Sequence, residues 1–278
     1  TVLRVLIPAI CLVYLDDIIV FSKTFQEHLT NLRAVFLCLR KAGLKIKPSK
    51  CNLLQPSVVY LGFHFAHDGI RPNPGKLESV RTWRQPTSKT AVRTFLGFAS
   101  YYRRFIPKFS MLAQPLHALT ESKATFAWSD AAAQAFNALK HALLTRPVLA
   151  YPIPNHTFIL DTDASDFAMG AVLSQKDSNG TEHVVAYASK SLSHSQRRYS
   201  ATRKELLAVV TFCEYFRHYL AGAHFTLRTD HKALVWLHNF TGTDGLLARW
   251  IERLAMFDYR IVHRPGKAHA NADGLSRK

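Results

Sequence analysis

Residues 157–163 read TFILDTD, a run that predicts a β-strand. Successive side chains of a strand point to opposite faces of its sheet. Asp161 and Asp163 therefore share one face, and Phe158 and Leu160 lie on the other. One of the two carboxylates is a candidate ligand for a metal ion.

A second strand-like run, FTLRTD, ends at Asp230 with the same Thr-Asp pair that ends at Asp163. Two predicted strands thus each present a carboxylate after a threonine. Aspartates at strand ends are most often turn residues, so this repetition alone is weak evidence for a site.

Strand and helix patterns alternate around these two runs. We expect strands at 168–175, 183–189 and 258–263, a long helix at about 202–220, and helical segments at 234–237 and 248–257. Strands mixed with helices predict an α/β fold with a partly parallel sheet.

Glu205 lies early in the predicted long helix, whose apolar stripe would face the sheet. Two interpretations are open. The carboxylate lies beside the strand ends, or Thr202 to Glu205 form a capping box that satisfies the first turn of the helix. Asp273 follows a short polar stretch near the end of the chain, where a surface acid is unremarkable.

The chain is strongly basic, with 36 Lys and Arg against 19 Asp and Glu and a formal charge of +17. The excess is N-terminal, because residues 1–150 hold 20 basic and 7 acidic side chains. Nucleic acid is the leading partner, and a solubilising basic surface is the alternative.

The four cysteines form no CxxC pair, which argues against a zinc site or a disulfide framework and favours a reducing compartment. The apolar stretch from Val5 to Phe21 is interrupted by Pro8, Asp16 and Asp17, so we expect no membrane partner. The chain begins with Thr, and we interpret it as a piece of something longer.

Residues 9–22 read AICLVYLDDIIVFS, which predicts a β-hairpin with Asp16 and Asp17 at its tip. A helix over 28–39 and a stop at Gly43 follow. The Pro-punctuated stretch 146–155 predicts a connector, with a domain boundary near residue 152.

Five stretches of the second half resemble, in order, the ribonuclease H domain of LTR retroelement polyproteins. They are LDTDASDFAMGAVLSQ (160–175), VAYASKSLSHSQRRYSATRKELLAVV (185–210), FTLRTDHKAL (225–234), ARWIERLAMFDYRIVHRPGK (248–267) and NADGLSR (271–277). Their combination is specific, and it covers nearly all of residues 150–277.

The resemblance implies that Asp163, Glu205, Asp230 and Asp273 are the catalytic and metal-binding carboxylates, with Asp161 structural. It implies two Mg²⁺ ions, or Mn²⁺, and cleavage of the RNA strand of an RNA/DNA hybrid. His263 lies where some relatives carry a histidine for product release or proton transfer, and a structural role is equally open.

The first half resembles gypsy-type reverse transcriptases. The YxDD-like Tyr14-Leu15-Asp16-Asp17 is followed by GLKIKPSKC (43–51), VVYLGFHFAHDGIRPNPGK (58–76), VRTFLGFASYYRRFIPKFS (92–110) and a connection-like stretch at 126–152. These imply metal ligation by Asp16 and Asp17. They also imply contacts with primer and template from Tyr14, Lys50, Tyr60, Leu61, Gly62, Arg93, Tyr101, Tyr102, Arg103 and Arg104.

Reverse transcriptases need a third carboxylate upstream of YxDD, and no matching stretch occurs in this sequence. We therefore expect an α/β chain with three parts: a truncated palm with the primer-contacting turn (1–70), a helical thumb and connection (71–152), and a ribonuclease H-like domain with a mixed sheet and flanking helices (153–278).

The expected function is that of a retroelement polymerase and ribonuclease H fragment whose hydrolytic site is the complete one. The alternatives are a non-catalytic nucleic-acid-binding remnant and a partner that completes a polymerase in trans. Other parts of the polyprotein or a dimer partner are further expected contacts. We expect a cytoplasmic location, with the nucleus and retroelement particles as alternatives.

Overall fold

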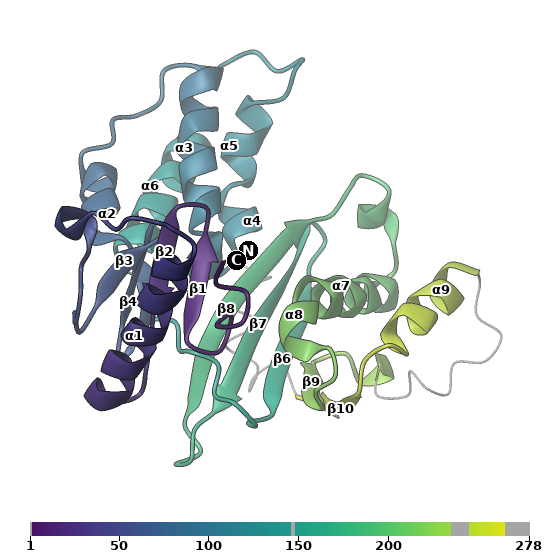
Figure 1. Ribbon diagram of the computed structural model, residues 1–278. Coiled ribbons are helices and arrows are strands. Elements are labelled where there is room, and N and C mark those ends of the chain that lie inside the picture. Colours follow the sequence, from purple (N-terminus) through teal and green to yellow (C-terminus); the bar gives the residue numbers. More distant parts are fainter. Residues whose placement is uncertain (1, 146–147, 235–244, 265–278) are drawn as a thin grey trace. The chain divides into compact units, whose positions relative to one another are not determined.

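The computed structural model describes residues 2–145, 148–234 and 245–264 (Figure 1). The chain divides into two compact units, Thr1–His67 and Asp68–Lys278. The three-part division expected from the sequence stays a prediction. Its second boundary, near residue 152, lies inside the second compact unit, and the division into two units does not test it.

The first unit begins with the predicted hairpin. β1 (Cys11–Tyr14) pairs antiparallel with β2 (Asp17–Val20), and Leu15, with φ +53°, lies in the turn between them. α1 (Phe25–Lys41) starts at Thr24, whose side chain accepts a hydrogen bond from the Glu27 N–H. A small apolar core forms between the helix and the hairpin from Leu3, Cys11, Val35 and Leu39.

A short 3₁₀ turn, η1 (Pro48–Lys50), precedes a second hairpin in the same unit. β3 (Val58–Tyr60) pairs antiparallel with β4 (Phe63–Ala66). Leu61 and Gly62 form its two-residue turn, and both have positive φ angles, of 48° and 73°. Two consecutive positive φ values match the turn type that two-residue hairpins favour.

The second unit opens with β5 (Gly69–Pro72) and a layer of helices. These are α2 (Pro74–Arg81), α3 (Lys89–Tyr101), η2 (Arg103–Phe105), α4 (Phe109–Leu112), α5 (Gln114–Leu119) and α6 (Asp130–Leu144). Side chains of Ser88 and Ser129 cap α3 and α6. The rings of Phe95 and Phe136 pack 4.5 Å apart between these two helices.

Residues 148–153 of the connector predicted at 146–155 form an extended segment, called the strap below. Ile70 and Leu149 exchange backbone hydrogen bonds of 2.8 and 3.0 Å, and the Ala150 N–H donates to the Val184 carbonyl at 2.8 Å. The side-chain amide of Gln175 donates to the Ile153 carbonyl at 3.1 Å. The strap therefore joins β5 to the sheet that follows.

That sheet has five strands in the order β10-β9-β6-β7-β8. They are β6 (Phe158–Ala164), β7 (Ala168–Lys176), β8 (Glu182–Ser191), β9 (Phe225–Thr229) and β10 (Tyr259–His263). β6, β7 and β8 are antiparallel, while β9 runs parallel to both β6 and β10. The mixed sheet predicted from the sequence is confirmed.

Helices follow the strands: η3 (Gln196–Arg198), α7 (Ala201–Tyr215), α8 (Arg217–Leu220) and α9 (Gly245–Leu254). The single long helix expected at 202–220 is therefore wrong in one respect, because α7 ends at Tyr215 and a short second helix, α8, begins at Arg217.

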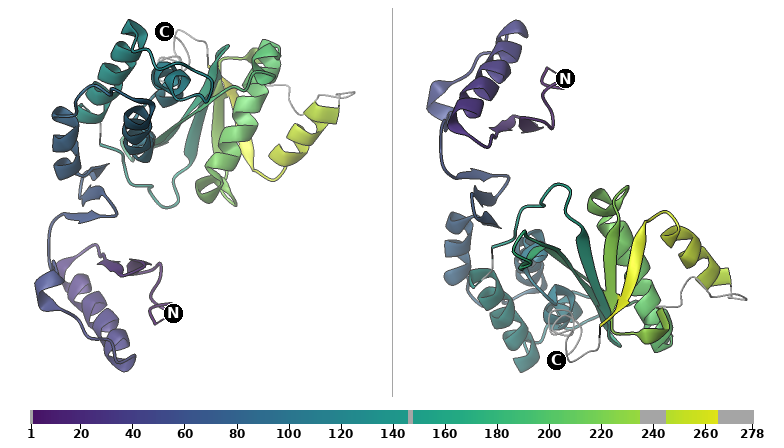
Figure 2. Two further views of the ribbon diagram at one scale, coloured as in Figure 1. Left: turned by 90° about the horizontal axis from the view of Figure 1, so that it is seen from above. Right: turned by 90° about the horizontal axis from the view of Figure 1, so that it is seen from below.

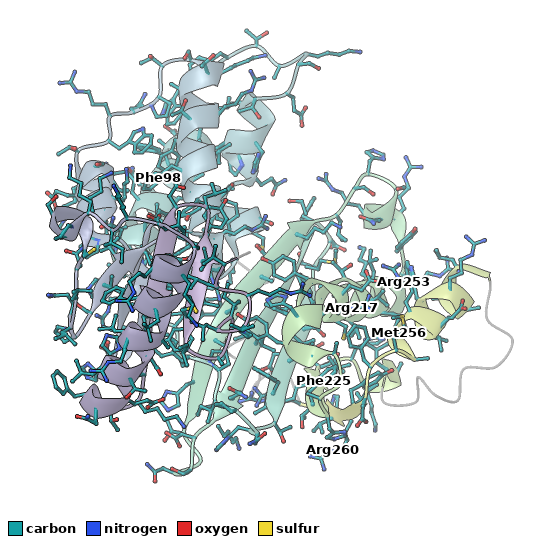
Figure 3. All side chains as sticks on the ribbon, viewed as in Figure 1. Phe98, Arg217, Phe225, Arg253, Met256 and Arg260 are labelled. Carbon is teal, nitrogen blue, oxygen red and sulfur yellow. The ribbon has the colours of Figure 1, made fainter. Side chains whose placement is uncertain are left out.

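α7 packs on β6 and β7 (Figure 2) and buries one apolar core with them. Phe225, labelled in Figure 3, is fully buried in that core. η2 and α4 of the helical layer pack against β8, at the edge of the sheet. The segment expected at 234–237 lies outside the described residues except for Leu234.

The four cysteines are free thiols, in line with the sequence. Burial raises the pKa of the Cys213 thiol to about 12, so this thiol stays protonated at neutral pH. Among the described helices, none has both the length and the apolar character needed to cross a bilayer.

Candidate metal centre

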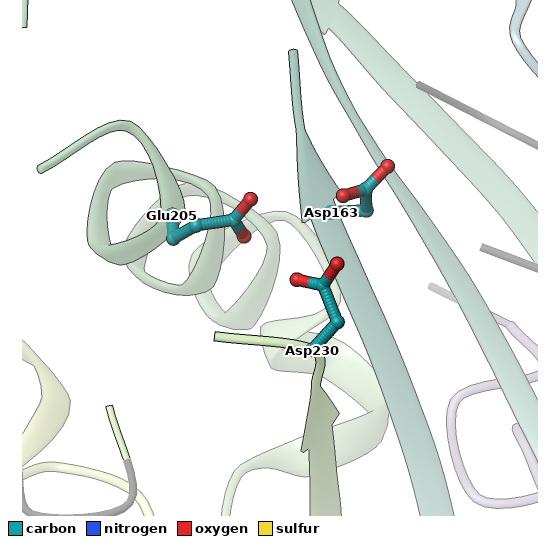
Figure 4. Close-up of side chains that lie close together, drawn as sticks. All are labelled: Asp163, Glu205 and Asp230. Atoms are coloured by element: carbon teal, nitrogen blue, oxygen red, sulfur yellow. The ribbon is translucent and has the colours of Figure 1, made fainter. Parts of the chain in front are cut away.

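Three carboxylates meet at one edge of the five-stranded sheet (Figure 4). Asp163 comes from β6, Glu205 from α7, and Asp230 follows the last residue of β9. One oxygen from each lies within 4.8 Å of the others. Among residues 2–145, 148–234 and 245–264, this is the only group of three or more His, Cys, Asp or Glu side chains gathered so closely.

The sheet register explains why Asp163 and Asp230 meet. β6 and β9 are parallel, with Phe158 opposite Phe225 and Asp161 opposite Arg228. Two residues further along the same register, Asp163 comes opposite Asp230. Parallel strands end at the same edge of a sheet, so the two Thr-Asp endings bring their carboxylates together.

Glu205 reaches this edge from the second turn of α7. Ser200 is the N-cap, and its Oγ accepts a hydrogen bond from the Arg203 N–H at 3.4 Å. The capping-box interpretation is therefore wrong, because the N-cap is Ser200 and Thr202 already lies inside the helix. Glu205 Oε1 instead accepts a hydrogen bond from the Ala164 N–H at 3.0 Å, across to the end of β6.

The electrostatics of the cluster favour a cation. Asp163 and Glu205 are 1% and 6% exposed, and Asp230 is half-buried. Carboxylates held this close repel each other, and burial removes the water that would screen them. Hard divalent cations such as Mg²⁺ and Mn²⁺ prefer oxygen ligands, so the donor set fits such an ion.

Asp161 lies two residues before Asp163 but has different partners. It is fully buried and forms an ion pair with Arg228, while Arg264 Nη1 lies 3.9 Å from its second oxygen. Arg228 also donates to Glu182 Oε2 at 3.0 Å. Asp161 is therefore engaged in a buried charge network, which agrees with the structural role expected for it.

The histidine at 263 lies on the exposed end of β10, and its Nε2 donates to the Asp230 carbonyl at 3.1 Å. A carbonyl oxygen can only accept, so Nε2 carries the proton in this contact. His263 thus holds the backbone of a cluster residue. Asp273, the fourth expected carboxylate, lies outside the described residues.

In the first unit, Asp16 and Asp17 are exposed at the hairpin tip, and Tyr14 is 56% exposed beside them. Partial burial and the negative charge of Asp17 raise the pKa of Tyr60, which lies before the Leu61-Gly62 turn. Lys50 is exposed on η1.

The expected nucleic-acid contacts of the second unit fall into two groups. Arg93 and Tyr101 are exposed, and an Arg93 Nη donates to the Thr120 carbonyl at 2.9 Å. Tyr102, by contrast, is 2% exposed, so its ring has no open face for a base. The structure does not support base stacking by Tyr102.

The last two residues expected to contact nucleic acid are Arg103 and Arg104. Both instead form hydrogen bonds with other elements of the second unit, β8 and α8. Arg103 donates to the Ser189 carbonyl of β8 and lies 5.2 Å from the ring centre of Phe109. Arg104 donates to the Tyr219 hydroxyl of α8 at 3.2 Å. Both are half-buried, and the basic sequence pattern did not indicate these packing roles.

Two sequence families match separate parts of this chain. Residues 2–65 match the reverse transcriptase (RNA-dependent DNA polymerase) family, and residues 128–227 match the RNase H-like domain found in reverse transcriptase.

Curated relatives match almost the whole chain. It is 40% identical over 277 residues to the retrovirus-related Pol polyprotein from transposon 297 of Drosophila melanogaster, covering 99% of this chain and 26% of that protein. It is 37% identical over 268 residues to the Tf2-3 polyprotein of Schizosaccharomyces pombe, covering 95% and 20%. The chain thus spans about a fifth to a quarter of the length of these relatives.

Solved structures share the fold at low identity. The foamy viral protease-reverse transcriptase in complex with an RNA/DNA hybrid gives a TM-score of 0.79 at 20% identity, covering 94% of this chain and 36% of that one. A second structure of that protein, in complex with double-stranded DNA, gives 0.79 at 22%, covering 95% and 57%. These matches confirm the fold class, and the curated relatives confirm the resemblance drawn from the sequence.

Proposed function

Since this chain is a homologue of retrotransposon Pol polyproteins and combines reverse transcriptase and RNase H-like segments, we propose that it hydrolyses the RNA strand of RNA/DNA hybrids. The observation that carries the proposal is the convergence of Asp163, Glu205 and Asp230 within 4.8 Å. Asp273 is the fourth carboxylate we assign to the site.

Asp163, Glu205 and Asp230 would hold divalent cations, with Mg²⁺ the first choice and Mn²⁺ a substitute. Bound ions of this class supply an activated water and stabilise the oxygen that leaves the scissile phosphate. The chain contributes the placement of the ligands. The Ala164 N–H orients Glu205, and His263 holds the Asp230 backbone.

The substrate class follows from charge and homology together. A chain with a formal charge of +17 attracts a polyanion. An RNA/DNA hybrid is the substrate we assign, and primer and template are the proposed partners of the first unit. The rival function, a nucleic-acid-binding remnant without catalysis, predicts hybrid binding without cleavage.

Cleavage of a hybrid whose RNA strand is labelled tests the proposal. The 278-residue chain with Mg²⁺ should release short RNA products, and EDTA should stop the reaction. Asp163→Asn should slow cleavage at least about a hundredfold, because loss of a metal ligand removes several kcal/mol of transition-state stabilisation.

Asp130→Asn is the matched control, because it makes the same change on an exposed acid in the first turn of α6. It should cleave at the parent rate. Fluorescence anisotropy reports hybrid binding for all three proteins. Binding by the parent chain without any Mg²⁺-dependent cleavage would reject the proposal and favour the remnant.

A further inference from the structure

One hydrogen bond joins the two elements that carry Glu205 and Asp230. Thr202 Oγ1, in the first turn of α7, lies 2.9 Å from Nε2 of His231, the residue after Asp230. Thr202 precedes Glu205 by three residues, close to one helical turn, so it lies on the same side of α7. The Thr202–His231 pair therefore spans the gap across which the two carboxylates face each other.

We propose that Thr202 and His231 are positioning residues that hold Glu205 and Asp230 at the separation a divalent cation requires. The inference rests on the proposed function, in which these carboxylates bind metal. It assigns the pair no contact with substrate and no step in proton transfer.

The His231 side of the pair is anchored by its own backbone. The His231 N–H donates to Thr229 Oγ1 at 3.1 Å, and the His231 carbonyl accepts from the Leu234 N–H at 2.9 Å. Thr229 is fully buried at the end of β9. Both ends of the residue are fixed, so the imidazole is presented to Thr202 from a rigid turn.

Two further hydrogen bonds, from the end of β10 and the residue after it, hold the end of β9. The His263 Nε2–H donates to the Asp230 carbonyl at 3.1 Å, and the Arg264 N–H donates to the Thr229 carbonyl at 2.9 Å. Asp230 itself lies just past the last residue of β9. These two hydrogen bonds hold the backbone at Thr229 and Asp230, next to the Asp230 carboxylate.

The Thr202 hydroxyl is free of the capping role that a threonine near a helix start often has. Ser200 caps α7, so the helix does not need Thr202 for its first turn. Lys204, two residues further along α7, pairs through Nζ with Asp166 at 2.6 Å. The Thr202–His231 bond thus directly connects the first turn of α7 to the residue that follows Asp230.

A positioning role makes physical sense because the carboxylates repel each other before an ion binds. Without this hydrogen bond, repulsion would increase the separation between the Glu205 and Asp230 carboxylates, and ion binding would first have to restore that separation. Partners that orient metal ligands through hydrogen bonds change metal affinity by about 10- to 100-fold when they are removed.

The experiment measures Mn²⁺ binding to the whole 278-residue chain without substrate, from the electron paramagnetic resonance signal of free Mn²⁺. Thr202→Val removes the hydrogen bond with little change in shape and should weaken binding roughly tenfold. Thr202→Ser keeps the hydroxyl and should bind like the parent. Thr94→Val is the control, since its hydroxyl bonds the Thr90 carbonyl on α3, away from the cluster residues in sequence and element.

The Mn²⁺ concentration that gives half-maximal hybrid cleavage should rise in Thr202→Val, with hybrid affinity unchanged. A residue that only supports the fold would lower the thermal unfolding temperature in EDTA and leave Mn²⁺ affinity unchanged. Equal Mn²⁺ affinity of Thr202→Val and the parent would therefore overturn the inference.

Asp163→Asn separates this inference from the function on which it rests. If Asp163→Asn loses Mn²⁺ and Thr202→Val does not, the metal site stands and the positioning role falls. If the parent chain binds no Mn²⁺, both fall.

Should Thr202→Val fail to fold, His231→Gln and His231→Leu give the same comparison. Gln can place a nitrogen near the position of the imidazole Nε2, whereas Leu cannot hydrogen bond. His231→Gln should bind Mn²⁺ more tightly than His231→Leu, and equal affinities would overturn the inference.

Discussion

Asp161 and Asp163 stand two residues apart on one strand and meet opposite kinds of neighbour. Asp163 faces two other carboxylates, whereas Asp161 faces Arg228 and Arg264. The sequence places both on the same face of β6 and does not distinguish them. What distinguishes the structural Asp161 from the candidate ligand Asp163 is the presence of two positive side chains, Arg228 from β9 and Arg264 from just after β10.

Asp161→Ala should destabilise the chain by about 3 kcal/mol, because it removes a fully buried carboxylate and leaves the half-buried Arg228 without one of its partners. Urea unfolding monitored by circular dichroism gives the free energy of unfolding. Mn²⁺ affinity should stay at the parent value, because Asp161 is not assigned to the metal site. If the variant is as stable as the parent, the charge network makes no net contribution to the free energy of unfolding.

Glu182, the other acid of this network, should make stability depend on pH. Burial raises its pKa, but hydrogen bonds from Arg228 and Ser174 and the charges of Arg228 and Arg264 outweigh burial, so its pKa is lowered overall. A lowered folded-state pKa stabilises the chain above the ordinary glutamate range, and this stabilisation is lost as pH falls through the lowered value.

Thermal unfolding of the parent and Glu182→Gln from pH 7 to pH 3 measures that contribution. The parent should be more stable than the variant at pH 7, and the difference should shrink toward the acid end. If the difference in stability between the parent and Glu182→Gln does not change with pH, the pKa of Glu182 is not lowered by folding.

At the scale of elements, the strap at 148–153 depends on one glycine in β5. Gly69 has φ +133°, and a Cβ at this position would lie 2.3 Å from the Leu149 carbonyl oxygen. Gly69→Ala should therefore destabilise the chain by about 2 kcal/mol or more, through backbone strain and the clash.

Gly97→Ala is the matched control in the same unit. Gly97 lies inside α3, and a Cβ there would meet nothing within 4 Å. It should leave stability unchanged or raise it by up to about 1 kcal/mol, since alanine favours a helix. Equal effects of the two substitutions on the urea midpoint would show that the close approach of Gly69 to the strap does not require a glycine.

Local elements could be predicted from the sequence because their signals are local. The Asp16-Asp17 hairpin, α1 and the strands β6 to β10 follow from periodicity and turn residues. The N-cap of α7 could not be assigned from the sequence, because Ser200 and Thr202 lie two residues apart and either side chain can cap a helix. Thr202 fits the capping-box pattern, but Ser200 is the N-cap.

The meeting of Asp163 and Asp230 is not readable from spacing. β6 and β9 are separated along the chain by β7, β8, α7 and α8, and their register is set by the whole sheet. The resemblance of the flanking sequence supplied that pairing. It did not indicate the hydrogen bonds of Thr202, His231 and His263, because a hydrogen-bond partner depends on side-chain geometry.

For the molecule as a whole, charge should govern affinity for nucleic acid. The excess of 13 positive charges in residues 1–150, from 20 basic and 7 acidic side chains, exceeds the 4 of residues 151–278, from 16 and 12. Hybrid affinity should fall at least tenfold between about 50 and 200 mM salt, because bound phosphates release counterions. Anisotropy titrations across this range test it, and a flat response would exclude phosphate contacts as the main source of affinity.

The two acidic sites of the chain, the Asp163 cluster and the Asp16-Asp17 hairpin, should differ in catalytic activity. The described part of the first unit presents Asp16 and Asp17 at the hairpin, without the third close ligand that the cluster of Asp163 has. Two-metal phosphoryl chemistry needs enough oxygen ligands to hold both ions. The 278-residue polypeptide should therefore cleave a hybrid without extending a primer on a template.

Parallel assays with a labelled primer and a labelled RNA strand measure the two activities in one preparation. Asp16→Asn with Asp17→Asn should leave hybrid cleavage at the parent rate, whereas Asp163→Asn should slow it at least about a hundredfold. Mg²⁺-dependent incorporation of dNTPs by the parent chain, lost in the hairpin variant and kept in Asp163→Asn, would contradict this prediction. It would show that Asp16 and Asp17, with or without further ligands that the sequence did not indicate, support polymerisation.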